Sequence, residues 1–475
     1  MTGLTESLSR FIANPGFETL PAEAARIVKT GFIDNVATMI AGRDEPVVRI
    51  VREFVAARKS GAREACVVFG AAMAASADAA LINATAAHAL DYDDVALGGH
   101  PSAVLVPAVL AEGEYLGATG ADALRAYVVG YEVWAELLAR EPDAYHVKGW
   151  HPTAVLGTIG ATAAVAHLHR LSAGACQNAL ALAASMASGL VANFGTMTKP
   201  FHAGRAASCA IEAVRFTISG LTAAPDAIEH HAGYLAALSP QGRVDRAGPA
   251  ATLGRQLRIL DSGLSIKSYP MCYATHRVID GVLDVVTAHD VKPGDVAQVH
   301  ASVGVTQASM LRNHSPVTGL EAKFSLEFAV ASALVARKVG LRELTDEFVT
   351  QPQVRELMTR VRTSTTDTHC PVEPIFAFTD CATLELKDGR RLDTGEIRFA
   401  RGNARLPLKD AELKAKFLDC AAGAGDLDGA ALYERLNAIE KLDRVRDLVF
   451  PAPDAHAAAE SRLERRSTES GSRPC

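Results

Sequence analysis

Four short segments of the chain concentrate side chains that could transfer protons or hold anions. The first runs from His88 to Asp94 and is followed by a Gly-Gly loop that leads to His100. A carboxylate beside an imidazole can fix the tautomer of the ring and set its pKa, as general acid–base catalysis requires. If the helix continues through this segment, Asp91 and Asp94 share one face. The alternatives are a helix end with capping aspartates and a divalent-metal site that includes Asp93.

Two further segments add histidine and lysine at predicted helix starts. In Gly149–Thr153, His151 precedes a proline, at a point where free backbone N–H groups favour an anion. In Asn193–Arg205, Lys199 and His202 follow an Ala-rich helix that we expect to be buried. A buried positive charge is energetically unfavourable unless an anion binds to it. A polar helix start and a basic surface loop are the corresponding structural alternatives.

The fourth segment, Ile266–Arg277, falls where the sequence pattern changes from helical to mixed. It carries Lys267, Tyr269 and His276 before Arg277. Ligand clefts form preferentially at junctions between domains, although a linker with incidental charges would look the same.

Together the four segments supply cations and histidines but little that resembles a nucleophile. The chain has no Gly-x-Ser-x-Gly elbow and no His-Glu-x-x-His sequence. This inventory suits proton transfer on a small polycarboxylate whose carboxylates are held by cations.

Composition narrows the class of protein that positions these groups. The chain has 475 residues, is 49% hydrophobic but only 6% aromatic, and carries a formal net charge of −6. Few aromatic platforms and no basic excess argue against a nucleic-acid partner. None of the eight cysteines forms a CxxC pair, and no secretory signal or membrane-spanning stretch is apparent. We therefore expect a cytoplasmic protein with reduced thiols and no membrane partner.

Hydrophobic periodicity divides the chain into helical and mixed regions. Three- and four-residue spacing predicts helices over 1–264, with Cys66–Phe69 as one short strand candidate. Period-two alternation over Val299–Val305 and Ala382–Leu386, the latter followed by an Asp-Gly turn, predicts strands in an α+β domain over 265–405. The helical pattern returns over 406–450, and 451–475 reads as a disordered tail. The predicted fold class is therefore mainly α: a large all-helical domain, discontinuous in sequence, with a smaller inserted α+β lid domain.

At these residues the chain resembles the MmgE/PrpD family, from about Leu4 to Leu442. The most specific parts of the resemblance are His88–Asp94 with Gly99–Ser102, Gly149–Thr153, Gly195–Gly204 and Lys267–Arg277. The family includes 2-methylcitrate dehydratase, cis-aconitate decarboxylase and iminodisuccinate epimerase. The resemblance implies a split helical domain with an α+β lid, a homodimer, and catalysis without a metal or an organic cofactor.

The resemblance also implies roles for individual residues. Asp91 corresponds to the cleft carboxylate of the family. His100 corresponds to its proton-transfer histidine, and we expect Asp91 to orient His100. The expected catalytic residues are Asp91, His100, His151, Lys199, Lys267 and His276. The expected substrate-binding residues are Lys199, His202, Lys267, Tyr269 and Arg277.

Details of the motifs separate the activities within the family. Val95 stands where the decarboxylase pattern has Thr, and the loop before His100 is one residue shorter, whereas Asn193–His202 and Ser268–Ala274 look closest to the epimerase. We expect a cofactor-independent lyase, a dehydratase or decarboxylase, that acts on a small di- or tricarboxylate. The alternatives are an epimerase of an iminodisuccinate-like dicarboxylate and a catalytically silent binding protein on the same fold.

Overall fold

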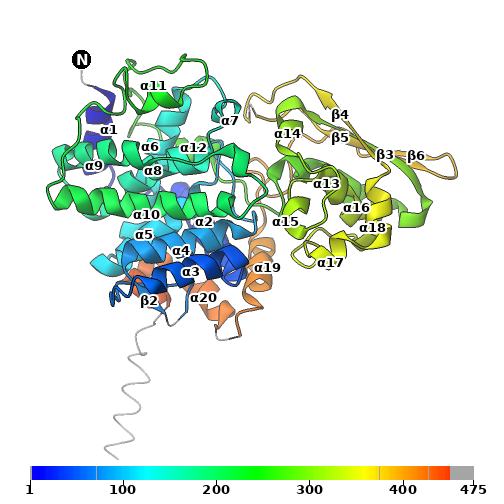
Figure 1. The fold of residues 1–475 in the computed structure, drawn as a ribbon, viewed down its shortest axis with the longest axis horizontal. Helices are drawn as coiled ribbons and strands as arrows, with labels where there is room; N and C mark the ends of the chain where they lie inside the picture. Colours follow the sequence, from blue (N-terminus) through cyan, green and yellow to red (C-terminus); the bar gives the residue numbers. More distant parts are fainter. Residues whose placement is uncertain (1–2, 71, 374, 426, 450–475) are drawn as a thin grey trace, which may run out of the picture.

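The computed structural model of the chain describes residues 3–70, 72–373, 375–425 and 427–449. Within them, a large helical body lies beside a smaller α+β part (Figure 1). The mainly α fold class with a smaller α+β part is confirmed. The tail predicted to be disordered, 451–475, lies outside the described residues.

The helical body is built from two stretches of sequence that pack together. Its helices are α1 (Leu4–Ala13), α2 (Ala22–Gly42), α3 (Pro46–Ala57), α4 (Ser76–Ala89), α5 (Pro101–Leu116), α6 (Gly120–Ala139), α7 (Tyr145–Lys148), α8 (Pro152–Leu168), α9 (Ala173–Met186), α10 (Thr198–Ile218), α11 (Tyr234–Leu238), α12 (Arg258–Ser262), α19 (Asp410–Ala421) and α20 (Gly429–Asn437). Both α19 and α20 pack against α2, so the end of the described chain rejoins its beginning. Short 3-10 turns supplement these helices: η1 (Val191–Asn193), η2 (Tyr273–Thr275), η3 (Pro293–Asp295), η4 (Ile439–Lys441) and η5 (Val445–Leu448).

Helices α4 and α10 approach each other closely because a glycine lies between them. A Cβ atom on Gly204 of α10 would lie 2.2 Å from Oγ1 of Thr85 and 2.4 Å from the carbonyl oxygen of Leu81, both on α4. Only glycine fits this contact without displacing backbone. Since α4 leads into the His88–Asp94 segment and α10 carries Lys199, this contact sets the separation of two candidate site segments.

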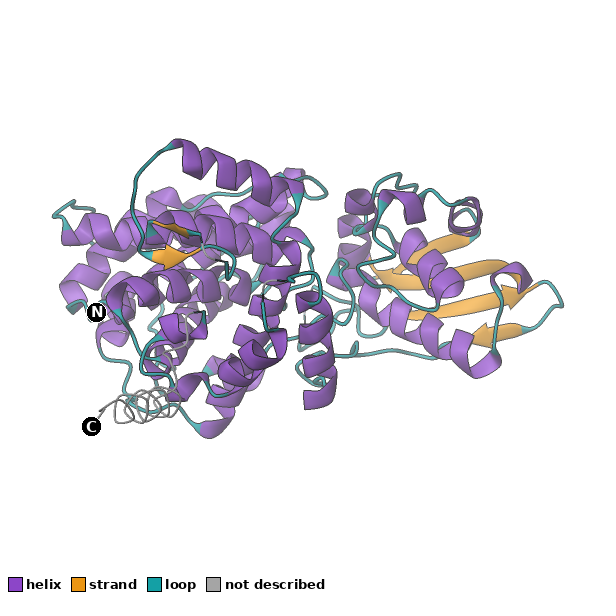
Figure 2. Cartoon of the chain, turned by 90° about the horizontal axis from the view of Figure 1, so that it is seen from below, coloured by secondary structure: helices purple, strands orange, loops and turns teal. Residues whose placement is uncertain are grey.

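The α+β part contains a four-stranded sheet in the order β4-β3-β5-β6, visible at the right of Figure 2. Its strands are β3 (Val296–Gly304), β4 (Val361–Thr366), β5 (Cys381–Leu386) and β6 (Arg391–Asp393). Strand β3 is parallel to β4 and antiparallel to β5, and β5 is antiparallel to β6. The helices of this part are α13 (His276–His289), α14 (Val305–Met310), α15 (Gly319–Ala322), α16 (Leu326–Ala336), α17 (Asp346–Val349) and α18 (Pro352–Met358). Helix α13 packs on β5 and α16 packs on β4, which buries the inner residues of the strands.

Buried apolar residues form two separate cores. One contains residues from Leu4 to Ile266 and from Leu413 to Leu448, and the other contains residues from Tyr269 to Ala400 together with Phe194. We retain the division into 1–264, 265–405 and 406–450 as a proposal that this grouping supports. No helix among the described residues is long and apolar enough to span a lipid bilayer.

Most locally predicted elements are present, with one clear error. The strands predicted over Val299–Val305 and Ala382–Leu386 are β3 and β5, and the Asp-Gly turn joins β5 to β6. The strand predicted over Cys66–Phe69 is wrong beyond its first residue. A short strand β1 (Ala65–Cys66) pairs with β2 (Met73–Ala74), but Val68 and Phe69 adopt positive φ angles of 46° and 55°, which extended strands do not allow.

Candidate active site

A cavity of about 460 Å³ opens where the helical body meets the α+β part. Asp91, His100, His151, Lys199 and Lys267 all line it, although they come from four separate segments of the sequence. The structure therefore brings together five of the polar residues that the sequence singled out. Each of them except His100 is buried, so the cavity encloses charge rather than displaying it on an open surface.

The chain leaves the helix just before Asp91. Helix α4 ends at Ala89, whose carbonyl accepts a hydrogen bond from the buried Lys323 Nζ (2.9 Å), and Asp91 then adopts a positive φ of 52°. A basic group on a terminal carbonyl stabilises a helix end. The helix does not continue to Asp94, so the expectation that Asp91 and Asp94 share a helical face is wrong.

The Asp91 carboxylate is held between two ammonium groups. Its Oδ1 atom lies 2.7 Å from Lys199 Nζ and 3.1 Å from Lys267 Nζ. Lys267 Nζ also donates to the backbone carbonyl of Asp91 (2.7 Å). Burial by itself would raise the pKa of Asp91, but the two lysines outweigh this effect and hold the pKa well below its usual range. The Asp91 carboxylate is thus shared between two ammonium groups, each of which has a third donor available for an anionic ligand.

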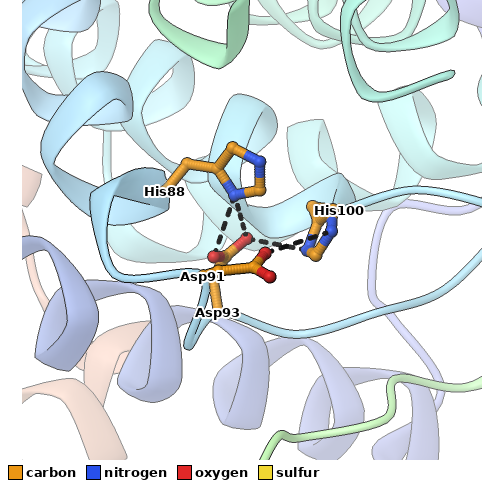
Figure 3. A group of neighbouring side chains, drawn as sticks. All are labelled: His88, Asp91, Asp93 and His100. Atoms are coloured by element: carbon orange, nitrogen blue, oxygen red, sulfur yellow. Dashed lines mark hydrogen bonds and ion pairs between the residues drawn. The ribbon is translucent and has the colours of Figure 1, made fainter. Parts of the chain in front are cut away.

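Asp93, not Asp91, fixes the orientation of His100 (Figure 3). Its Oδ2 atom lies 3.0 Å from Nδ1 of His100, and the backbone carbonyl of Asp94 lies 2.9 Å from the same nitrogen. Asp91 Oδ1 is 3.8 Å from Nε2, on the other side of the ring. The expectation that Asp91 orients His100 is thus wrong. With two oxygen acceptors at Nδ1, the proton resides there, and Nε2 carries the lone pair that a general base needs.

Burial keeps His100 neutral. It lowers the pKa of His100, and the nearby Asp93 carboxylate only partly opposes this effect. A neutral imidazole can accept a proton, whereas an imidazolium cannot. The resting site therefore presents a base at neutral pH.

The Lys199 side chain is bordered by aromatic rings as well as by Asp91. Its Nζ atom lies 5.4 Å from the ring centre of Phe194 and 5.6 Å from that of Phe324, within the range of cation–π attraction. The ring of His151 packs edge-on against Phe194. His202 lies behind His151, with 3.2 Å between their Nδ1 atoms, and is not among the cavity-lining residues.

Three other residues expected at the site lie in the interior of the α+β part. Tyr269 donates to Asp280 Oδ1 (2.6 Å), and the fully buried His276 packs between Tyr269 and Tyr273. Arg277 donates to the Ala377 carbonyl (2.8 Å). None of Tyr269, His276 and Arg277 lines the cavity. The partners of Tyr269 and His276 lie within 11 residues of them, whereas Arg277 contacts a carbonyl 100 residues later, which local sequence does not indicate.

Two basic residues that the sequence analysis did not select contribute to the site. Lys416 on α19 donates to the backbone carbonyls of Tyr92 (2.8 Å) and Lys267 (2.9 Å), so the returning helix ties two site segments together. Arg405 lines the cavity at its exposed rim, and its guanidinium donates to the carbonyl of Asp261 (3.0 Å). Arg405 directly follows Gly-Asn-Ala in an unremarkable loop, which gives no sequence signal for a site residue.

One group of side chains has the donor types of a metal site. Ligand atoms of His88, Asp91, Asp93 and His100 lie within 4.8 Å of one another. Two observations argue against a resident cation: Asp91 is already paired with two ammonium groups, and Lys199 Nζ lies 3.0 Å from Nε2 of His88. A divalent ion would have to bind beside these positive charges.

Two family models match the chain in succession. The MmgE/PrpD N-terminal domain matches residues 6–247, and the MmgE/PrpD C-terminal domain matches residues 269–438. The second match extends into α20 and so includes helices that pack in the helical body.

Curated relatives with similar sequences are named cis-aconitate decarboxylase. The protein from Homo sapiens is 30% identical over 353 residues, which cover 71% of this chain and 71% of that protein. The protein from Mus musculus is 29% identical over 384 residues, covering 78% and 76% respectively. One from Aspergillus terreus is 22% identical over 390 residues, covering 76% and 78%.

Proposed function

The chain belongs to the MmgE/PrpD family, and from this premise we propose that it is a lyase-type enzyme that acts on a small polycarboxylate. The observation that carries the proposal is the pair of buried ammonium groups, Lys199 and Lys267, beside the neutral base His100 in one cavity. Cations bind the carboxylates of the substrate, and the base moves a proton at the carbon next to one of them.

In the proposed mechanism the two lysines hold the substrate and stabilise developing charge. Both ammonium groups contact Asp91, which fixes their positions before the substrate arrives. When a carbanion or enolate forms, the negative charge that spreads onto the substrate carboxylate strengthens its interaction with these lysines. His151, also on the cavity wall, supplies a further hydrogen-bonding group.

The same His100 could serve dehydration or decarboxylation. In dehydration, Nε2 removes a proton from the carbon next to a carboxylate, and the hydroxyl group on the neighbouring carbon takes a proton from the resulting imidazolium and leaves as water. In decarboxylation of an unsaturated acid, His100 first takes up a proton from water. A C–C bond then breaks, carbon dioxide leaves, the double bond migrates, and the imidazolium donates its proton to the former alkene carbon. A bound polyanion favours the imidazolium, since opposite charge raises the pKa of histidine.

We select cis-aconitate as the first substrate to test, because the similar curated proteins carry that name. Epimerisation is a second candidate, because it needs acid–base groups on two faces of the substrate and both His100 and His151 line the cavity. His276, which we expected to be the second group, does not line the cavity.

The test is incubation in heavy water with 2-methylcitrate, cis-aconitate, citrate and iminodisuccinate, followed by proton NMR. A lyase converts one acid into a new unsaturated product, whereas an epimerase exchanges an α-proton without loss of atoms. If no acid is exchanged or converted, the alternative of a silent binding protein is favoured. Undiminished turnover in excess EDTA would remove the metal-dependent alternative.

A further inference from the structure

His88 lies at the centre of the site but outside the cavity wall. It is 1% exposed and lies near the end of α4, next to Asp93 (Figure 3) and within hydrogen-bond distance of Lys199. Its Nδ1 atom is 3.0 Å from both carboxylate oxygens of Asp93, and its Nε2 atom is 3.0 Å from Lys199 Nζ. The ring therefore connects the carboxylate that orients His100 to one of the two ammonium groups.

The contacts of the ring determine where its proton lies. A carboxylate accepts hydrogen bonds and an ammonium group only donates them. The proton must therefore be on Nδ1, facing Asp93, and the lone pair on Nε2 must face Lys199. Burial lowers the pKa of His88 to about 3 against the opposing effect of Asp93, in agreement with a neutral ring.

This arrangement uses two of the three donors of the Lys199 ammonium group. One N–H is directed to Nε2 of His88 and one to Oδ1 of Asp91 (2.7 Å). The Phe194 and Phe324 rings border the group but accept no conventional hydrogen bond. The third N–H is left for a ligand in the cavity, which Lys199 lines.

We propose that His88 is a positioning residue: as a neutral Nδ1–H imidazole held by Asp93, it accepts a hydrogen bond from Lys199 and directs the remaining donor of that ammonium group at a substrate carboxylate. The proposal rests on the proposed function for the identity of the anion, but the state of the ring is independent of it. The close approach of α4 and α10 at Gly204 keeps His88 within reach of Lys199.

The first experiment measures the ring directly and needs no substrate. Protein labelled with ¹⁵N-histidine is examined by long-range ¹H–¹⁵N NMR between pH 6 and 8, and the His88 signals are assigned by their loss in His88→Gln. The expected spectrum shows a neutral ring with a protonated Nδ1 and an unprotonated Nε2. An imidazolium, or a proton on Nε2, overturns the proposal.

The second experiment compares two substitutions in steady-state turnover of whichever acid the heavy-water panel identifies. We expect His88→Leu to lower kcat/KM about 10- to 100-fold, because Lys199 loses a charge-assisted hydrogen bond. His88→Gln should stay within about threefold of the wild type, since its amide can donate to Asp93 and accept from Lys199. His167→Gln is the matched control, because His167 faces the Ile12 carbonyl outside the cavity.

The outcomes separate this proposal from the proposed function. If no acid is turned over, the proposed function fails and the NMR tautomer still decides the role of His88. If the enzyme is active, wild-type turnover in folded His88→Leu overturns the positioning role. Equal losses in folded His88→Gln and His88→Leu would also overturn it, since they would show that the amide does not restore the hydrogen bonds.

Discussion

The two walls of the cavity differ in chemistry. The wall from the helical body presents Asp91, His100, His151 and Lys199, whose polar atoms face one another around the reaction site. These groups are attached to the ends of packed helices, where α4 stops and where α5, α8 and α10 begin. Because the helices pack rigidly against one another, the side chains at their ends keep a fixed arrangement.

Apart from Lys267 and the polar residues Glu373, Asn403 and Arg405, the wall from the α+β part is mainly apolar where it faces the cavity. It contributes Met310, Phe324, Ile375 and Phe376. Its basic Arg277 lies behind this wall, paired with acidic groups of the same part of the chain. Under the proposed function, the helical body together with Lys267 supplies the chemistry, and the rest of the α+β part supplies the shape. Substitutions in the first should change turnover, and those in the second should change stability or substrate size.

The largest expected effect concerns the cavity wall that the helical body contributes. His100→Gln should lower kcat about 10²–10⁴-fold, because it removes the general acid–base group. Stability should change little, since His100 borders the cavity and the amide can still donate to the Asp94 carbonyl. The measurement is steady-state turnover with thermal unfolding of the same sample, and His167→Gln is the control. Full turnover in folded His100→Gln would contradict the assignment.

Arg277→Met tests the opposite wall. Arg277 is 3% exposed and pairs with the partly buried Glu373 (3.2 Å) and the buried Asp380 (3.9 Å), so the substitution leaves both carboxyl groups without their cation. We expect a loss of about 3–5 kcal/mol in the free energy of unfolding. Burial raises the pKa of Asp380 to about 6 even with Arg277 present, so the loss should be smaller at pH 5.5, where the carboxyl groups can take up protons.

The control for Arg277→Met is Arg390→Met, which removes an exposed ion pair with Asp388 and should cost less than about 1 kcal/mol. Denaturant unfolding at pH 8 and pH 5.5 measures both variants. If Arg277→Met instead leaves stability intact and raises KM, the arginine binds substrate and the contrast between the two walls does not hold.

Buried neutral histidines on both sides of the cavity should make the fold sensitive to acid. Burial lowers the pKa of His276 to about 3, whereas an unfolded histidine titrates near 6.5. Below pH 6.5 the unfolded state binds the proton and the folded state does not, so stability is lost as pH falls. At pH 5.5 this histidine alone should cost about 1.4 kcal/mol relative to neutral pH.

The test is the slope of the unfolding free energy between pH 7.5 and 5.5. His276→Asn should reduce that slope by up to one proton, and substitution of the exposed His369 by Asn should leave it unchanged. An unchanged slope in His276→Asn would show that the ring is protonated in the folded protein. Since His276 packs among tyrosines of the α+β part, its substitution should also affect turnover much less than that of His100.

The sequence predicted the two-part fold and most of the polar residues on the cavity wall of the helical body, because both depend on local signals. Periodicity marks helices and strands, and His151 and Lys199 lie at helix starts with recognisable composition. The partner of His100 was not predictable, because Asp91 takes a positive φ that redirects the following aspartates. The structural role of Arg277 depends on acidic groups 96 and 103 residues later in the chain, and no local pattern reports such distances.

The smallest expected effect concerns Arg405, which lies where the chain returns from the α+β part to the helical body. It lines the exposed rim of the cavity, and its guanidinium forms no ion pair within the described residues. An accessible cation at the mouth of the cavity should attract an anionic substrate to this acidic protein. Arg405→Gln should therefore raise KM about two- to fivefold at low ionic strength, with kcat unchanged. Salt screens exposed charges, so the difference from the wild type should shrink as sodium chloride is added, and Arg405→Lys should retain the wild-type KM. A salt-independent rise in KM in both variants would instead show that Arg405 contacts the substrate directly and that this contact depends on the geometry of the guanidinium group. A charged residue at the junction of the two walls would then help to recognise the shape of the substrate.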